Sequence, residues 1–188
     1  IIQAVQDLKA TPLIGIRAKL SSKSSGRWSK SIGDKSKFGL SIPEIMSTIK
    51  ELKEANLINE MKLLHFHIGS QISDIAVIKD ALQEASQIYV ELCKLGAPMK
   101  YIDVGGGLGI DFDGTKTSSN TSTNYSLQNY ANDVIATIKD SCELNNIRHP
   151  TIISESGRAI ISHCSVLIFN VLGTSHVSSK LKINHEKN

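Results

Sequence analysis

Short apolar runs alternate with segments of helical periodicity along this chain, and that alternation constrains the fold more than any other feature. The apolar runs are residues 12–19, 62–69, 101–104 and 151–155, with a further run from Cys164 to Leu172 that we expect to form another strand. Strands that alternate with helices are typical of βα units and a parallel sheet. Four or five such units fit either an open doubly wound sheet or part of an eight-stranded barrel. A complete barrel takes about 250 residues, so this chain could supply roughly half of its strands.

Helices are predicted between the strands from capping residues and apolar stripes. Ser41 and Glu44 have the spacing of a capping box, and the stripe that follows consists of Ile42, Ile45, Met46, Ile49 and Leu52. Asp74 is positioned to cap a second helix, which Gly96 and Pro98 are expected to end. A third helix is predicted around the apolar residues Tyr130, Val134, Ile135 and Ile138.

The remaining segments are mostly polar. Residues 21–37 and 113–124 are predicted to be loops, and residues 174–188 a poorly ordered tail. The first residue is Ile1 rather than Met, and residues 1–10 already have the pattern of a helix. We therefore expect the chain to be a piece of a longer protein.

Composition argues against several function classes. Lys and Arg number 21 against 18 Asp and Glu, and the net charge of +3 is spread along the chain, so no nucleic-acid partner is expected. No apolar stretch approaches the roughly 18–20 residues that cross a bilayer, and no leader pattern is present, so we expect a cytoplasmic protein without membrane contact. Cys93, Cys142 and Cys164 lack CxxC spacing. Neither a disulfide framework nor a zinc site is expected, and no metal ligands are assigned.

Three short motifs follow the predicted strands: HFHIGSQ at residues 65–71, DVGGGLGID at residues 103–111 and SESGRA at residues 154–159. In parallel α/β folds, polar residues at the carboxyl ends of strands face the functional site. The successive glycines of the second motif leave N–H groups unobstructed, which suits a phosphate, although a tight turn is the more ordinary explanation. Neither the P-loop pattern nor the dinucleotide pattern GxGxxG is present.

Side chains of the other two motifs have both functional and ordinary explanations. His67 and Ser70 lie at and beyond a strand end, where an imidazole can stack and a hydroxyl can donate, whereas His65 is expected to be a packed strand residue. Glu155 and Arg158 could form a simple ion pair. Alternatively, Glu155 faces a protonated ring nitrogen and Arg158 helps to hold a phosphate.

Together with IRAKL at residues 16–20 and KFGL at residues 37–40, these motifs resemble the biosynthetic arginine decarboxylases of bacteria and plants over about residues 13–173. The resemblance implies an α/β fold of the alanine-racemase type, in which residues 1–173 form part of a (β/α)8 TIM barrel and a β-domain follows. It also implies pyridoxal 5'-phosphate as the cofactor. Magnesium, and a homo-oligomeric full-length protein, are further family properties.

The resemblance assigns roles to individual residues. It implies that His67 stacks on the pyridoxal ring and that Glu155 pairs with the ring nitrogen, which makes these two the candidate catalytic residues. The other candidate cofactor-binding residues are Arg17, Ser70, Gly105, Gly106, Gly107, Gly157 and Arg158. The candidate substrate-binding stretch is Asp103, Val104, Gly105, Gly106, Gly107, Leu108, Gly109, Ile110 and Asp111. For Asp111, a solvated loop acid is the more ordinary alternative.

The implied reaction converts L-arginine to agmatine and carbon dioxide in polyamine biosynthesis. None of the lysines matches the family lysine that bonds covalently to the cofactor, so the chain alone is expected to be inactive. A related ornithine or diaminopimelate decarboxylase and a non-catalytic decarboxylase-like binding protein remain alternatives. The polar residues 21–40 and the phrase LGIDFDG at residues 108–114 favour arginine, by resemblance.

Overall fold

The sheet of this protein is parallel, as the alternation of apolar runs predicts. The computed structural model describes residues 1–21 and 37–175. Within them, four strands lie in the order β1-β2-β3-β4: β1 Ile14–Arg17, β2 Met61–His65, β3 Tyr101–Asp103 and β4 Thr151–Ile153. Nearly all of the predicted loop over 21–37, and residues 176–188 of the predicted tail, lie outside the described residues.

The register of the sheet places the last residues of the strands in one row. Arg17 pairs with His65, His65 with Asp103, and Asp103 with Ile153. Because side chains alternate along a strand, this row shares one face of the sheet, and the preceding residues share the other. The preceding residues form the core: Ile16, Leu64 and Ile102 are buried and Ile152 is partly buried.

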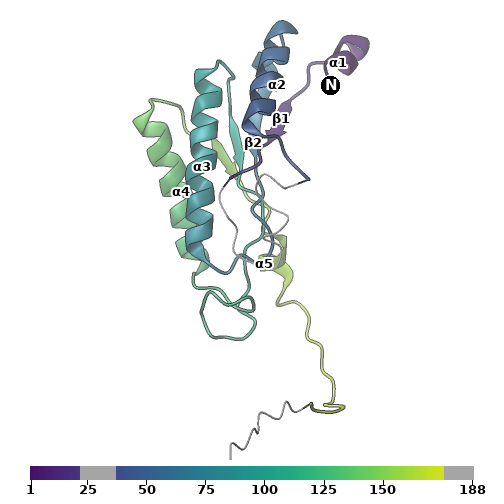
Figure 1. Ribbon diagram of the computed structural model, residues 1–188, viewed down its shortest axis with the longest axis vertical. Helices are drawn as coiled ribbons and strands as arrows, with labels where there is room; N and C mark the ends of the chain where they lie inside the picture. The colour runs from purple at the N-terminus through teal and green to yellow at the C-terminus, as the bar shows by residue number, and fades with distance from the viewer. Residues whose placement is uncertain (22–36, 176–188) are drawn as a thin grey trace, which may run out of the picture.

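Three long helices cover the core face: α2 Ile42–Glu54, α3 Ile75–Lys94 and α4 Leu127–Leu144. Figure 1 shows them side by side along the sheet. The shorter helices are α1 Ile2–Leu8, η3 Ile58–Glu60 and α5 Gly157–Ile161. On the opposite face of the sheet Gly15 and Thr151 are exposed, so the described helices cover one face only. Strands with helices on one side are the arrangement of part of a (β/α)8 barrel.

The predicted helix starts are confirmed. The Ser41 N–H donates to Glu44 Oε2 over 2.7 Å, as in a capping box, and Asp74 Oδ1 accepts the N–H of Ala76 over 3.0 Å. The predicted stripes are partly wrong, since Ile42, Met46 and Ile135 are 50%, 47% and 57% exposed. These residues lie at the margins of their stripes, whereas Ile45, Ile49, Leu52, Val134 and Ile138 are buried.

All four strands end earlier than predicted. β2 ends at His65 rather than near Gly69 and β4 at Ile153 rather than Glu155, while β1 ends at Arg17 rather than Lys19 and β3 at Asp103 rather than Val104. The pairing stops where the glycine-rich turn after β3 begins: Gly105 has a φ of +67°, which turns the backbone out of the extended conformation. Strand length here is set by a neighbouring segment and not by the apolar run itself.

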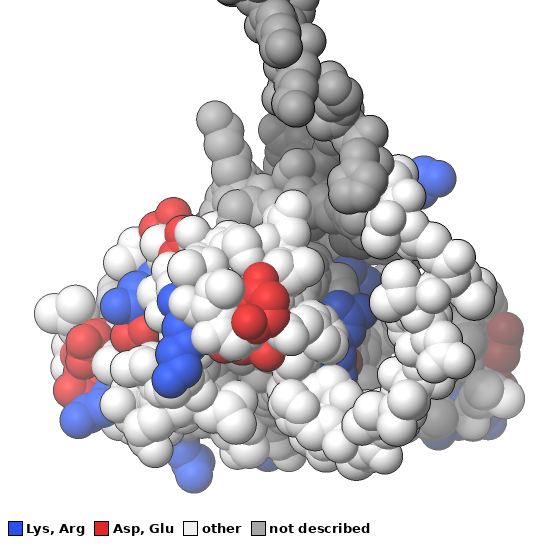
Figure 2. All heavy atoms as spheres, turned by 90° about the horizontal axis from the view of Figure 1, so that it is seen from below, with Lys and Arg blue, Asp and Glu red and all other residues white. Residues whose placement is uncertain are grey.

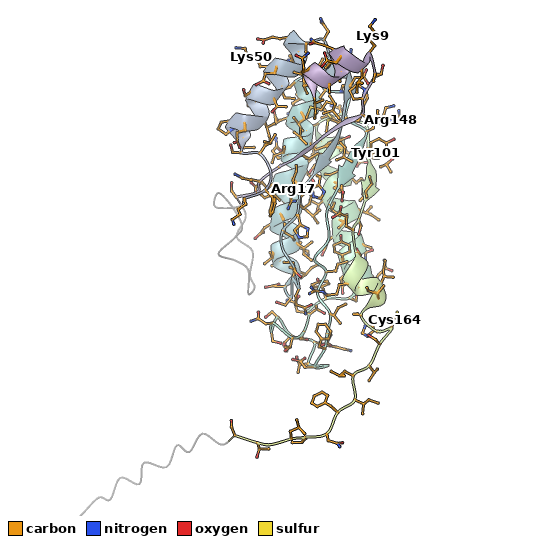
Figure 3. The ribbon with its side chains drawn as sticks, turned by 90° about the vertical axis from the view of Figure 1, so that its right-hand side faces the viewer. Lys9, Arg17, Lys50, Tyr101, Arg148 and Cys164 are labelled. Atoms are coloured by element: carbon orange, nitrogen blue, oxygen red, sulfur yellow. The ribbon has the colours of Figure 1, made fainter. Side chains whose placement is uncertain are left out.

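The strand predicted from Cys164 to Leu172 is not formed. The segment follows α5 and has no hydrogen-bonded ladder with any described strand, and Val166 and Leu172 are 83% and 100% exposed. Figure 3 labels Cys164 where the chain leaves α5 and runs away from the sheet. An apolar run forms a strand only when an edge lies beside it to pair with, and the described part of the chain places none there.

Two predicted absences concern the cysteines and the membrane. Cys93, Cys142 and Cys164 are free thiols, so the prediction of no disulfide among them is confirmed. Among the described helices, none combines the length and apolar character that crossing a membrane requires.

Candidate cofactor site

The three motifs meet at the carboxyl ends of β2, β3 and β4. The contact is close, because a Cβ at Gly105, Gly106 or Gly107 would lie under 3.0 Å from a backbone carbonyl oxygen of Phe66, Glu155 or Gly69, respectively. Gly107 also has a φ of +95°, which side chains of L-residues rarely adopt. The glycine triplet therefore lets the loops after β2 and β4 approach the turn after β3.

Donors at this turn fit a bound phosphate. Gly105 N–H donates to Asp103 Oδ1 over 2.9 Å, whereas Gly106 N–H makes only a long contact of 3.5 Å with His67 Nδ1. No described residue accepts a hydrogen bond from Gly107 N–H or bonds the Ser70 hydroxyl. A turn with unpaired N–H groups is a common phosphate-binding device. The tight-turn explanation of the glycines and the phosphate explanation are thus compatible.

His67 lies among the charged groups of the site. Partial desolvation lowers the pKa of His67, and the nearby charges of Arg17 and His65 lower it further, against the opposing effects of Glu155 and Asp103. The imidazole is therefore neutral at physiological pH. The same interactions show that residues from all four strand ends lie within electrostatic reach of one ring.

Glu155 and Arg158 do not pair with each other. The described residues contain no ion pair between the two side chains, and no hydrogen bond is formed by either of them. The backbone of Glu155 is nevertheless fixed, since its N–H donates to Gly105 O over 2.9 Å and its carbonyl accepts from Gly157 N–H over 3.0 Å. The simple ion pair considered above is absent, which leaves both charged groups available to a ligand.

His65 has a partner that the sequence did not indicate. Its Nδ1 lies 3.0 Å from Asp103 Oδ2, with the two side chains 17% and 12% exposed. His65 is thus partly buried, as expected of a packed residue, but its ring also faces a carboxylate. One ligand atom each from His65, Asp103 and Glu155 lie within 4.8 Å of one another, a grouping that could hold a metal ion and that the sequence analysis did not assign. Only the register of β2 and β3 brings this pair together, and register is not visible in either motif alone.

The stretch 103–111 is held by side chains that the sequence analysis did not single out. The Gln71 amide donates to Ile110 O over 2.7 Å and accepts from Ile110 N–H over 3.0 Å. The Tyr125 hydroxyl accepts from Gly109 N–H over 3.0 Å. Asp111 accepts a 2.6 Å hydrogen bond from the buried hydroxyl of Ser122. Gln71 was within a quoted motif, whereas Tyr125 and Ser122 carry no local pattern that would have identified them.

Arg17 belongs to the same end of the sheet. It is the last residue of β1, and its guanidinium carbon lies 5.3 Å from the centroid of the Phe38 ring. Figure 3 shows Arg17 nearer than Tyr101 to the end at which α5 lies. Figure 2 views the molecule from that end, where acidic and basic side chains are interspersed with uncharged ones.

Comparison with known proteins identifies the family. The family model for the pyridoxal binding domain of the pyridoxal-dependent decarboxylases matches residues 1–162. The chain belongs to this family. Among curated relatives, the biosynthetic arginine decarboxylase of Prochlorococcus marinus (strain AS9601) is 95% identical over 188 residues, which are 100% of this chain and 29% of that protein. The biosynthetic arginine decarboxylase of Parasynechococcus marenigrum (strain WH8102) is 65% identical over 96% of this chain and 28% of its own length.

Solved structures agree with this family membership. The biosynthetic arginine decarboxylase of Campylobacter jejuni has a TM-score of 0.70 and 38% identity, over 84% of this chain and 24% of that chain. A diaminopimelate decarboxylase of Helicobacter pylori in complex with L-lysine has a TM-score of 0.66 and 25% identity, over 84% of this chain and 36% of that one. The pyridoxal-decarboxylase fold predicted from the motifs is confirmed. The chain spans less than a third of the length of the curated relatives it matches.

Proposed function

We propose that this chain provides the cofactor cradle of an enzyme that decarboxylates L-arginine to agmatine. The proposal is carried by the convergence, at one end of the sheet, of the His67 imidazole with its lowered pKa and of two groups without a partner among the described residues, the Glu155 carboxylate and the Gly107 N–H. The names of the similar curated proteins and of the Campylobacter jejuni structure support arginine as the substrate.

The residues of the cradle have chemical properties that fit pyridoxal phosphate. When bound, this cofactor supplies an electron sink for the electrons of the bond between Cα and the carboxylate. Glu155 would keep the ring nitrogen protonated, since an opposite charge within about 4–6 Å shifts a pKa by about one to three units. His67 would offer a flat, uncharged ring for stacking. Gly107 N–H, the Ser70 hydroxyl and the Arg158 guanidinium would bind the phosphate.

A chimera provides the test. This chain replaces the matching segment of the Prochlorococcus marinus arginine decarboxylase, and release of carbon dioxide from arginine is measured. Glu155→Gln removes the charge and keeps the shape, and we expect turnover to fall about 10- to 1000-fold, the equivalent of one to three pKa units at the ring nitrogen. Glu54→Gln, which alters an exposed acid on α2, is the control. Near-normal turnover of Glu155→Gln with bound cofactor would contradict the role assigned to Glu155.

The same chimera distinguishes between the possible substrates. An arginine decarboxylase should show a far higher kcat/KM for arginine than for ornithine or diaminopimelate. The similarity to the diaminopimelate decarboxylase structure makes the second comparison necessary. A chimera that binds pyridoxal phosphate but turns over none of the three would favour the binding-protein alternative.

The remaining inferences rest on the family resemblance. We infer that the full-length enzyme is cytoplasmic, self-associates and uses magnesium. Light scattering of the chimera tests self-association. Removal of divalent cations with a chelator, followed by magnesium replacement, tests the cation requirement. Cell fractionation tests the location.

A further inference from the structure

Asp103 joins the ends of three strands through its side chain. It is the last residue of β3 and is 8% exposed. Its Oδ1 accepts from Gly105 N–H over 2.9 Å, and its Oδ2 lies 3.0 Å from His65 Nδ1 at the end of β2. Gly105 O in turn accepts the N–H of Glu155, which follows β4, over 2.9 Å. One carboxylate thus connects β2, β3 and, through Gly105, the segment after β4.

The two contacts of the Asp103 carboxylate have separate effects. The bond to Gly105 N–H closes the turn in which Gly105 has its φ of +67°. The 3.0 Å contact with His65 Nδ1 is favoured by a proton on that nitrogen, because a carboxylate accepts and does not donate, and it restrains the position of the His65 ring. A hydrogen bond to an ionised group is stronger than one between neutral groups, which strengthens the constraint on the Gly105 turn.

Loss of the carboxylate would reach Glu155 through the backbone. The Gly105 turn holds the Glu155 N–H by the 2.9 Å bond, and the adjacent Gly106 packs so closely that an added Cβ would overlap Glu155 O, so a shift of the turn is expected to displace the Glu155 backbone. A displacement of a reacting group by about 1 Å can lower a rate about 100-fold. Asp103 touches neither His67 nor the unpaired donor of Gly107 by any hydrogen bond in the described residues.

We propose that Asp103 and His65 are positioning residues of the decarboxylation site, which place the Gly105 turn and, through it, Glu155. The inference rests on the proposed function and deepens it. It predicts that the charge on Asp103 and a donor at the Nδ1 position of residue 65 are both required for turnover. Turnover does not require an imidazole at position 65, because another side chain with a donor at the same place would serve.

Substitutions at His65 separate these requirements. His65→Asn carries its amide nitrogen at about the position of Nδ1, so it keeps the donor for Asp103. His65→Gln carries its amide near the position of Nε2 and loses that donor. In the active chimera, we expect His65→Gln to lower kcat about tenfold or more and His65→Asn to stay within about threefold of the parent, because a hydrogen bond to a charged group is at stake.

Asp103→Asn tests the carboxylate directly. The amide can still accept from Gly105 N–H, but its NH2 group then faces His65 Nδ1, so the two donors conflict unless the histidine changes tautomer. We expect the dissociation constant of pyridoxal phosphate to rise about tenfold and kcat to fall about tenfold, since a hydrogen bond to a charged group is lost. Because the two Asp103 oxygens face Gly105 and His65, the KM for arginine should change little; a raised KM with unchanged kcat would instead support the substrate-binding role expected for Asp103 from the sequence. Asp140→Asn, which alters an exposed acid on α4, should match the parent.

The outcomes distinguish this inference from the proposed function. If the parent chimera neither binds pyridoxal phosphate nor decarboxylates arginine, the proposed function is wrong. If the parent is active and Asp103→Asn and His65→Gln match it, the positioning role is wrong and the proposed function stands. Equal impairment of His65→Asn and His65→Gln also overturns the inference, because the Nδ1 donor would then not matter. Circular dichroism checks folding, and if Asp103→Asn fails to fold, the pair of His65 variants decides.

Discussion

Gly107 and Gly96 offer a matched test of why the turn after β3 has a glycine at position 107. Both have a φ of +95°, so alanine at either position meets the same unfavourable backbone conformation. Around Gly96, which follows α3, nothing lies within 4 Å of an added Cβ. Around Gly107, the Cβ would lie under 3.0 Å from Gly69 O and 3.0 Å from Gly69 C. The difference between the two substitutions therefore isolates the contact between the β2 and β3 loops.

The expected losses of stability and of cofactor affinity follow from these two environments. Gly96→Ala is expected to lower the free energy of unfolding by about 1–2 kcal/mol, the cost of a left-handed conformation with a side chain. Gly107→Ala has the same cost and must also push the Gly69 backbone away, which adds about 1–3 kcal/mol of overpacking. Because Gly69 precedes Ser70 and Gly107 N–H is a candidate phosphate donor, Gly107→Ala should also weaken pyridoxal phosphate binding by about tenfold or more, the equivalent of at least one lost charge-assisted hydrogen bond.

The assay compares the two variants in the active chimera. Thermal melting of the apoprotein reports stability, and titration with pyridoxal phosphate, followed by its absorbance, reports affinity. Gly96→Ala should lower the melting temperature modestly and leave the affinity unchanged, whereas Gly107→Ala should lower both. Equal losses in the two variants would refute the reasoning, because only the loop contact distinguishes them.

Three further predictions concern other parts of the described structure. The lowered pKa of His67 means that the folded protein binds fewer protons than the unfolded chain below about pH 6.5, so stability is lost as the pH falls from there toward the folded pKa. Between pH 7.5 and pH 5.5, the melting temperature should therefore fall less for His67→Gln than for the parent. An equal or larger fall for the variant would contradict this. Ser122→Ala removes the 2.6 Å donor of Asp111 and should lower stability by about 1–3 kcal/mol, measured by urea unfolding; an unaltered midpoint would show that this bond is unimportant. The isolated chain should release no carbon dioxide from arginine, because no lysine in it matches the cofactor-bonding lysine of the family; turnover abolished by mutating one of its own lysines would refute that.

Features determined by neighbouring residues in the sequence were predictable. The capping box of Ser41 and the cap by Asp74 depend on spacing of two or three residues, and both are formed. The positions of His67 and Glu155 at one end of the sheet followed from the rule that the carboxyl ends of parallel strands meet. That rule needs only the existence of the strands and not their exact ends.

Features determined by distant segments were not predictable from a single sequence. The 3.0 Å contact between His65 and Asp103 depends on the register between β2 and β3, and one residue of slip would turn the two side chains to opposite faces. The early end of β2 depends on the turn at Gly105. The failure of the Cys164–Leu172 strand has the same origin, since apolar character alone does not supply a pairing edge.

The sequential order of the strands bears on how the molecule acquires its structure. In the described part of the chain, β1 pairs with β2, β2 with β3 and β3 with β4, so none of these pairings has to wait for a segment two units further along. Contacts between units that are close in sequence have a low entropy cost of loop closure, which favours fast folding. During synthesis the amino-terminal units emerge from the ribosome first. Among the described strands, each unit can therefore add to an edge that already exists, and Glu155, which follows β4, would join the site after Arg17 and His67.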